Sequence, residues 1–419
     1  MASSHEGNFT LNGFSISTPN GSLDLTPYAI KCDIYESILA SSVICEITLS
    51  DSTGMLDAFD FTEECVCISF STYDEYEPVH YEVKVVQINP IKSTPNDKNV
   101  VFVMTCLSEE ILKSKTLKNI PLVRKKIESE KIVKSMLNLT ETKKNLHVEK
   151  TKGIHSFGLT NITPFDAIDR VRRTAVSEKY NSSSFVFFEN RDGYHFKTIE
   201  KLIDDGNKKI GDKFFIHTTL AGVDVSGTKW RNIIAYKVVQ SGNQSVGLLT
   251  GGYSNSVRRY NLETGELELY EKPSKNVDFV SLNEGSVSTS LTQQNERSKD
   301  EGKITLNLFN PDQENNQLAE KHNFLPYYLT KFLTIISHIT IYGDSTITIG
   351  DVITCKLPKI NGLTNESYKE DSSIYSGNYL VCKCRHVLTF GDSPKYYQAL
   401  EIVKDGMIND DSTSGVNFT

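Results

Sequence analysis

The chain has 419 residues and a formal net charge of −8, which predicts two to four domains and argues against a general nucleic-acid binder. No apolar run approaches the roughly 18 residues that a membrane span needs, and residues 1–7 lack the basic and apolar regions of a secretory signal. The eight cysteines are therefore expected to be reduced, in a soluble protein made in a cytoplasm.

Residues 9–112 predict alternating strands and turns. Apolar side chains recur at every second position from Val43 to Leu49, which is the period of a half-buried strand. They also alternate up to Val85, after which the apolar positions shift by one residue and continue from Val86. Such a one-residue slip predicts a β-bulge or a strand that bends between two sheet faces. We expect an antiparallel β-barrel or sandwich here.

The middle of the chain mixes helices with strands. A helix is predicted over 129–139, where apolar residues share one face. Another begins at Thr163, because threonine caps a helix and Pro164 suits its first turn. The letters Asn-Arg-Asp-Gly at 190–193, between two aromatic runs, predict a β-hairpin.

Further along, strands are expected from residues 213–240 and a hairpin over 260–270. A helix that Pro326 starts or kinks is predicted within 318–336. Residues 281–302 and the tail 409–419 are polar and are expected to form a loop and a mobile end.

The two ends of the chain carry one pattern twice. In each copy a strand ends in a short acidic turn, at Asp51 and at Asp344. An acidic residue, Glu64 or Asp351, then precedes a β-branched run, and two long alternating strands close the copy. The copies span about 28–112 and 335–403. Three chains with a doubled unit present six similar units, so the pattern predicts a ring with pseudo-sixfold symmetry.

Two Cys-x-Cys pairs raise the question of a metal site. They are Cys65/Cys67 and Cys382/Cys384. Residues two apart on a strand lie roughly 6.5–7 Å apart, so one pair does not easily chelate one ion, although four cysteines from two strands can still converge. Small core residues are the favoured interpretation.

Two carboxylates and two histidines are candidate catalytic residues. Glu189 and Asp192 flank the aromatic hairpin and allow a glycosidase pair, but carboxylates at a turn are more often solvated or capping. His195 and His386 lie in apolar strands and are expected at a core edge or interface. Nucleophile-elbow and phosphate-loop motifs are absent from the sequence. We therefore expect no catalytic residue, no cofactor and no metal ligand.

Residues 113–152 form a basic stretch. Twelve lysines or arginines stand there against four glutamates, so the rest of the chain carries about −16. The stretch is either a solvated helix face or a docking surface for an acidic partner, such as the acidic β-domains of a neighbouring copy. Sparse aromatic residues argue against a nucleic-acid groove.

Eight short passages along the chain are informative in combination. They are IYESI at 34–38, EITLSD at 46–51, EECV at 63–66, FFEN at 187–190, GYHF at 193–196, SGNYLV at 376–381, RHV at 385–387 and LEIV at 400–403. Together they resemble the baseplate hub proteins of contractile-tailed phages of the T-even type. Their order along the chain is that of the family, and none is a catalytic motif.

The resemblance implies a structural virion protein of the tail baseplate, assembled in the host cytoplasm as a homotrimer. Its two tube domains per chain would form a pseudo-hexameric ring that adapts a threefold central spike to a sixfold tail tube and nucleates the tube. Tail tube or adaptor proteins, and wedge proteins, would be further partners. DNA would pass through the lumen without specific binding.

The expected fold is mainly β with an α+β middle. The predicted domains are a first tube domain at 1–113, a basic connecting domain at 114–206, a second tube domain at 207–240 with 325–405, an inserted segment at 241–324 and a polar tail at 406–419. Two other functions stay open: the hub of a related contractile injection device, and a tail-tip cell-wall hydrolase.

Overall fold

The structure, a computed structural model, describes most of the chain. The described residues are 7–18, 21–54, 64–72, 77–92, 100–117, 120–210, 213–217, 231–241, 255–261, 264–271, 280–283, 286–287, 303–309, 329, 332–358, 372 and 374–408. Most of the predicted helix at 318–336, most of the predicted loop at 281–302 and the whole tail at 409–419 lie outside them.

The N-terminal part folds into a set of antiparallel strands that we call the first module. Its elements are β1 (Thr10–Thr18), β2 (Gly21–Asp24), the short 3-10 helix η1 (Thr26–Tyr28), β3 (Ala29–Ser37), β4 (Ile44–Asp51), β5 (Cys65–Ser71), β6 (Val79–Lys92) and β7 (Val100–Leu107). The strands pair in the order β2-β1-β5-β6-β7-β4-β3. Alternate side chains of β4 are buried, as its period of two predicts.

Strands from two distant parts of the chain form the second module. They are β13 (Phe214–His217), β14 (Asn232–Ser241), β19 (Ile335–Tyr342), β20 (Val352–Lys356), β21 (Gly377–Thr389) and β22 (Lys395–Lys404). Pairings from β13 through β14, β19, β22, β21 and β20 lead back to β13, so the six strands close a circuit. Among the described residues, β1 and β3 do not pair, and a barrel in both modules stays a prediction.

The two modules share one strand order. The first has β1-β5-β6-β7-β4-β3, and the second has β13-β20-β21-β22-β19-β14 in the corresponding places. Five of these strands also match in direction, whereas β13 runs parallel to its neighbours where β1 runs antiparallel to β5. The predicted duplication is therefore confirmed at the level of strand order.

A β-bulge stands at the same place in both modules. The pairing of β6 with β7 shifts between Val85 and Gln87, and that of β21 with β22 shifts between Val381 and Lys383. Val85 and Val381 each donate a backbone hydrogen bond to the acidic residue before the preceding strand. The bulge predicted at Val85 is confirmed, and it aligns β6 with β21 from Val85 to Pro90, where a further shift in β6 begins.

A second bulge aligns β3 with β14. The pairing of β3 with β4 shifts between Ala29 and Lys31, and that of β14 with β19 shifts between Ile233 and Ala235. Both shifts lie opposite the second half of the partner strand. Bulges are specific features of a fold, so two shared bulges reinforce the internal duplication.

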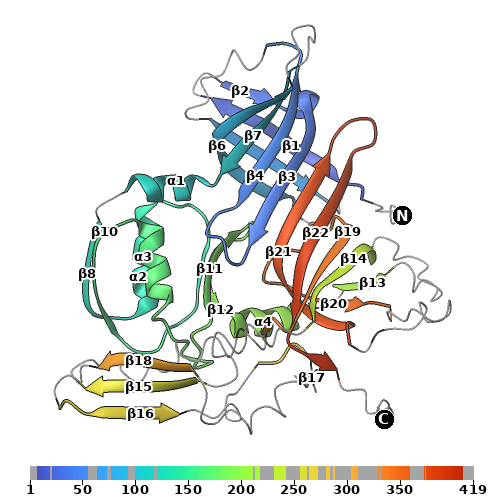
Figure 1. Ribbon diagram of the computed structural model, residues 1–419. Helices are drawn as coiled ribbons and strands as arrows, with labels where there is room; N and C mark the ends of the chain where they lie inside the picture. Colours follow the sequence, from blue (N-terminus) through green and yellow to red (C-terminus); the bar gives the residue numbers. More distant parts are fainter. Residues whose placement is uncertain are drawn as a thin grey trace, which may run out of the picture.

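The middle of the chain lies beside both modules (Figure 1). Its elements are α1 (Glu109–Thr116), β8 (Ile120–Ile127), α2 (Ser129–Leu139), β9 (Leu146–Val148), β10 (His155–Ile162), α3 (Pro164–Arg172), β11 (Phe185–Asn190), β12 (Gly193–Thr198) and α4 (Ile199–Lys209). The predicted helix at 129–139, the cap at Thr163 and the hairpin at 190–193 are confirmed, since Thr163 accepts from Asp166 N and Asn190 pairs with Gly193.

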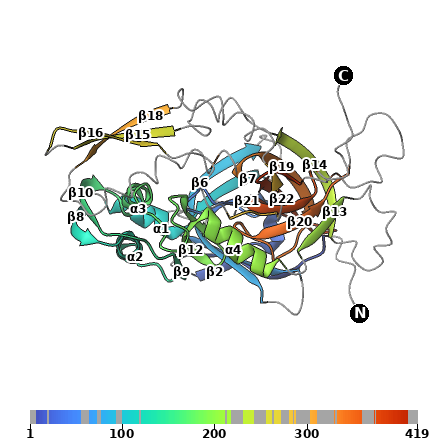
Figure 2. The same ribbon diagram turned by 90° about the horizontal axis from the view of Figure 1, so that it is seen from below.

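The described residues form three apolar cores. One fills the first module, and one packs α2 and α3 on the hairpin. The third joins the second module to Ile199, Leu202 and Ile203 of α4, so that helix covers the second module (Figure 2). The division into five domains stays a prediction.

The remaining strands belong to two small sheets of their own. They are β15 (Asn255–Asn261), β16 (Leu267–Glu271), β17 (Ser286–Val287), β18 (Lys303–Phe309) and β23 (Met407–Ile408). The strand orders of these sheets are β16-β15-β18 and β17-β23. β15 and β16 form the hairpin predicted at 260–270. Within the described residues, no helix is long and apolar enough to cross a membrane.

Candidate functional site

The two modules join edge to edge into one sheet. The second half of β21 pairs antiparallel with β3, from Lys383 opposite Ser37 to Thr389 opposite Lys31. Figure 1 shows these strands side by side, although roughly 350 residues separate them in sequence. Backbone hydrogen bonds continue the contact beyond the ladder, from Ile38 N to Cys382 O. We call this contact the junction, and it is the candidate assembly site because it shows how one module accepts another.

Charged side chains cover one face of the junction. Arg385 donates to Asp33 over 3.1 Å, and Asp33 also pairs with Lys31 at 2.7 Å. The Arg385 guanidinium stacks over the ring of Tyr35, 5.3 Å from its centroid. Cation–π stacking and the ion pairs add side-chain specificity to the backbone ladder.

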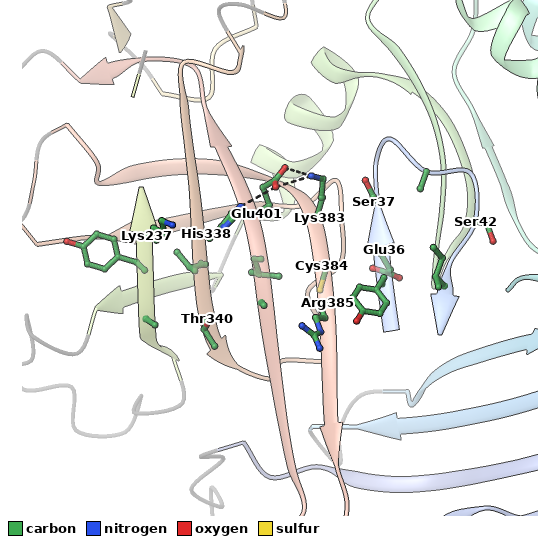
Figure 3. A pocket seen from close by; sticks show the side chains of 18 residues that line it. Glu36, Ser37, Ser42, Lys237, His338, Thr340, Lys383, Cys384, Arg385 and Glu401 are labelled. Atoms are coloured by element: carbon green, nitrogen blue, oxygen red, sulfur yellow. Dashed lines mark hydrogen bonds and ion pairs between the residues drawn. The ribbon is translucent and has the colours of Figure 1, made fainter. Parts of the chain in front are cut away.

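A groove of about 520 Å³ runs over this face and onto the second module. Strands β3, β14, β19, β21 and β22 all contribute to its wall. Figure 3 shows Glu401 between His338 and Lys383, which it contacts at 3.2 Å and 3.0 Å. The wall is of mixed charge, so it offers no continuous basic track for a nucleic-acid backbone.

A buried polar cluster on the other side of the junction ties all three parts of the chain together. Glu36 of the first module accepts from the Tyr81 hydroxyl at 2.9 Å and from the backbone N–H of Arg191, in the middle, at 3.1 Å. Its second oxygen accepts from Thr348 of the second module at 2.9 Å and lies 3.5 Å from His386 Nε2.

The electrostatics of the cluster favour an ionised Glu36. Burial alone would raise the pKa of this carboxyl group, but hydrogen bonds and charge from His386, with the hydroxyls of Thr348 and Tyr81, lower it below its ordinary value. His386 in turn shares a 2.7 Å hydrogen bond with Tyr396 through Nδ1. Both histidines singled out from the sequence are buried, His386 at the junction and His195 in the β11–β12 hairpin.

The cysteines do not converge as four. Cys384 lies near His386 and Glu36, and Cys65 and Cys67 lie near Glu82, with the possible ligand atoms of each group within 4.8 Å of one another. The first group was missed because Glu36 is far away in sequence. Both oxygens of Glu36 already accept hydrogen bonds from the protein, so the polar contacts of the junction account for this group of side chains. That the chain binds no metal stays a prediction.

Glu189, a candidate catalytic residue from the sequence, is bound within a buried hydrogen-bond network. It is only 3% exposed, and its oxygens accept from Lys144 at 2.6 Å, from Ser108 at 2.5 Å and from the backbone N–H of Val43. Burial raises its pKa, which the charge of Lys144 opposes. The side chain of Asp192 is about half exposed, so the two carboxylates have different surroundings.

Lys144 is the single cation between two buried carboxylates in this described network. Its ammonium group lies 2.8 Å from Glu110 and 2.6 Å from Glu189. Replacing it by methionine (Lys144→Met) should lower the free energy of unfolding by about 2–4 kcal/mol at neutral pH, because two carboxylates lose their partner. Urea unfolding measures this. Adding Glu189→Gln should restore part of the loss, and a stability equal to wild type would contradict the network.

His195 and the basic stretch at 113–152, also singled out from the sequence, contact neighbouring side chains of the protein. His195 is stacked between Phe188 and His147, and burial lowers its pKa to about 3, so it stays neutral near neutral pH. In the basic stretch, Lys113 and Lys131 pair with neighbouring glutamates. These pairs favour the solvated interpretation, and the docking alternative stays a prediction.

No known protein-family model matches the chain. A curated protein named "Probable baseplate hub protein gp334", of Vibrio phage KVP40, is 22% identical over 401 residues, which cover 90% of each chain. The resemblance to phage baseplate hub proteins is confirmed. Solved structures of a tail protein from Neisseria meningitidis and a prophage 43 kDa tail protein from Shewanella oneidensis cover 94% of the chain and are themselves 98% covered. Each has a TM-score of 0.55, with identities of 10% and 7%, so they show that the fold is that of phage tail proteins.

Proposed function

We propose that the chain is a structural baseplate hub subunit of a phage virion and that it works as a homotrimer. Three copies place six similar modules in one ring, which adapts a threefold central spike to a sixfold tail tube and nucleates that tube. The lumen passes DNA without binding it specifically, and wedge proteins contact the ring from outside. The proposed role is structural and includes no catalytic activity.

One observation carries this proposal. Two modules of the same strand order are already joined edge to edge inside one chain. A contact that joins similar units in one direction closes into a ring when it is repeated at a suitable angle. The name of the Vibrio phage relative supports the baseplate role.

The mass of the purified protein in solution tests the trimer. Native mass spectrometry and light scattering should give about three times the chain mass of 47.0 kDa, alone or with a candidate spike protein. A candidate tube protein should polymerise only on the trimer. A chain that stays monomeric at high concentration and in the presence of spike protein would overturn the proposal.

A further inference from the structure

Each module leaves one strand edge without a neighbour in the described fold. In β6, the pairing with β5 ends at Lys84, and no described strand pairs with that edge further along. In β14, the pairing with β13 covers only its first two residues, and no other described strand adds to that edge. Exposed strand edges are templates for another chain.

These two edges correspond to the two strands that meet at the junction. The shared bulges align β6 with β21 and β14 with β3. Along one edge, β21 pairs with β20 in its first half and with β3 in its second half. The corresponding edge of β6 pairs with β5 in its first half, and its second half lacks a described partner. The strand that corresponds to β3 is β14, so β14 of another copy is the matching partner for this half of β6.

We propose that β6 of one copy pairs antiparallel with β14 of the next copy, with Pro90 opposite Val238. This register is the junction's own, because Pro90 takes the place of His386, and Val238 that of Ile34. Counting one residue on along both strands places Asn89 opposite Val239, at a shift of the β14–β19 pairing between Val238 and Gln240 that β3 does not share. The inference rests on the proposed trimer and assigns the surface that closes it.

Exposed apolar side chains mark both edges. Val86 is 41% exposed, whereas Cys382, its counterpart in the buried junction, is 7% exposed. On β14, Val239 is 50% exposed. Large apolar side chains at a strand edge are a liability in a monomer, and a second copy would cover them.

The chemistry of this contact differs from that of the junction. Pro90 has no N–H to donate, so one ladder hydrogen bond is missing at its position. Asn89 and Lys237 replace Arg385 and Asp33, so the junction's ion pair is not repeated. The contact between copies therefore depends on backbone hydrogen bonds and apolar cover, which suits subunits that fold first and assemble afterwards.

Disulfide cross-linking tests the register. The double variant Asn89→Cys/Val239→Cys should give covalent dimers and trimers on mild oxidation, seen on a denaturing gel without reductant. Each single variant controls for the native cysteines, and Asn89→Cys/Lys237→Cys, two residues out of register, should cross-link at least tenfold less. Circular dichroism checks that all variants fold.

The outcomes separate this inference from the trimer itself. A protein that is trimeric under reducing conditions but cross-links equally in both double variants, or in neither, overturns the proposed pairing and leaves the trimer intact. A protein that is monomeric under all conditions overturns the proposed trimer and the pairing with it.

Discussion

Replacing Gly343 by alanine is expected to destabilise the protein by about 3 kcal/mol or more, since overpacking a rigid site is costly. An added Cβ would lie 1.9 Å from Cδ1 of Tyr396 and 2.1 Å from its Cγ. The ring cannot move aside easily: it is fully buried, packs edge-on against Phe70 with centroids 5.2 Å apart, and holds His386 through its hydroxyl.

Thermal unfolding measures the effect of Gly343→Ala. A fall of roughly 5–10 °C in the unfolding midpoint is expected for a change of this size. Gly13→Ala is the matched control, because Gly13 lies in a strand of the same sheet and a Cβ there meets nothing within 4 Å. Equal midpoints for the two variants would show that Tyr396 does not pack against Gly343 as described.

Replacing Glu36 by glutamine should weaken the protein by about 2–4 kcal/mol at neutral pH. The amide nitrogen of glutamine would face a donor, either the Tyr81 and Arg191 pair or Thr348, and the charge beside His386 would be lost. Urea unfolding gives the difference from wild type. Glu46→Gln, which changes a part-buried carboxylate bound to the Tyr35 hydroxyl, is the control and should cost about 1 kcal/mol or less.

The pH dependence of this difference follows from the lowered pKa of Glu36. A carboxyl group whose pKa is depressed by folding stabilises the protein above its unfolded value of about 4.5, and this contribution is lost as the pH falls through the folded value. The difference between wild type and Glu36→Gln should therefore be full near pH 7 and shrink below pH 4.5. A difference that does not change with pH would rule out an ionised Glu36.

Local features of the fold were predictable from the sequence because their causes are local. The alternation of β4, the phase slip at Val85 and the cap at Thr163 each depend on a few neighbouring residues. The duplication was also visible, through acidic residues that precede equivalent strands.

The junction was not predictable in the same way. Glu36 stands in an ordinary strand, and nothing near it in sequence indicates that Thr348 and His386 complete its surroundings. Likewise, the counterpart of β3 is β14, which precedes the inserted segment, so the sequence pattern places the start of the second copy at β19 and misses β14. Long-range strand pairing of this kind has no signature within one segment.

The direction of β13 has a consequence for the proposed assembly. β1 and β13 hold corresponding places but run in opposite directions, so neighbouring units around the ring are not identical. In every second unit of the proposed ring, the strand at this place would run parallel to its neighbours, and in the others it would run antiparallel. In the proposed assembly, a spike with three equal faces can therefore recognise alternate units and bind in one of two rotational orientations. A tube protein that contacts only the strands common to both modules would meet six equivalent binding sites.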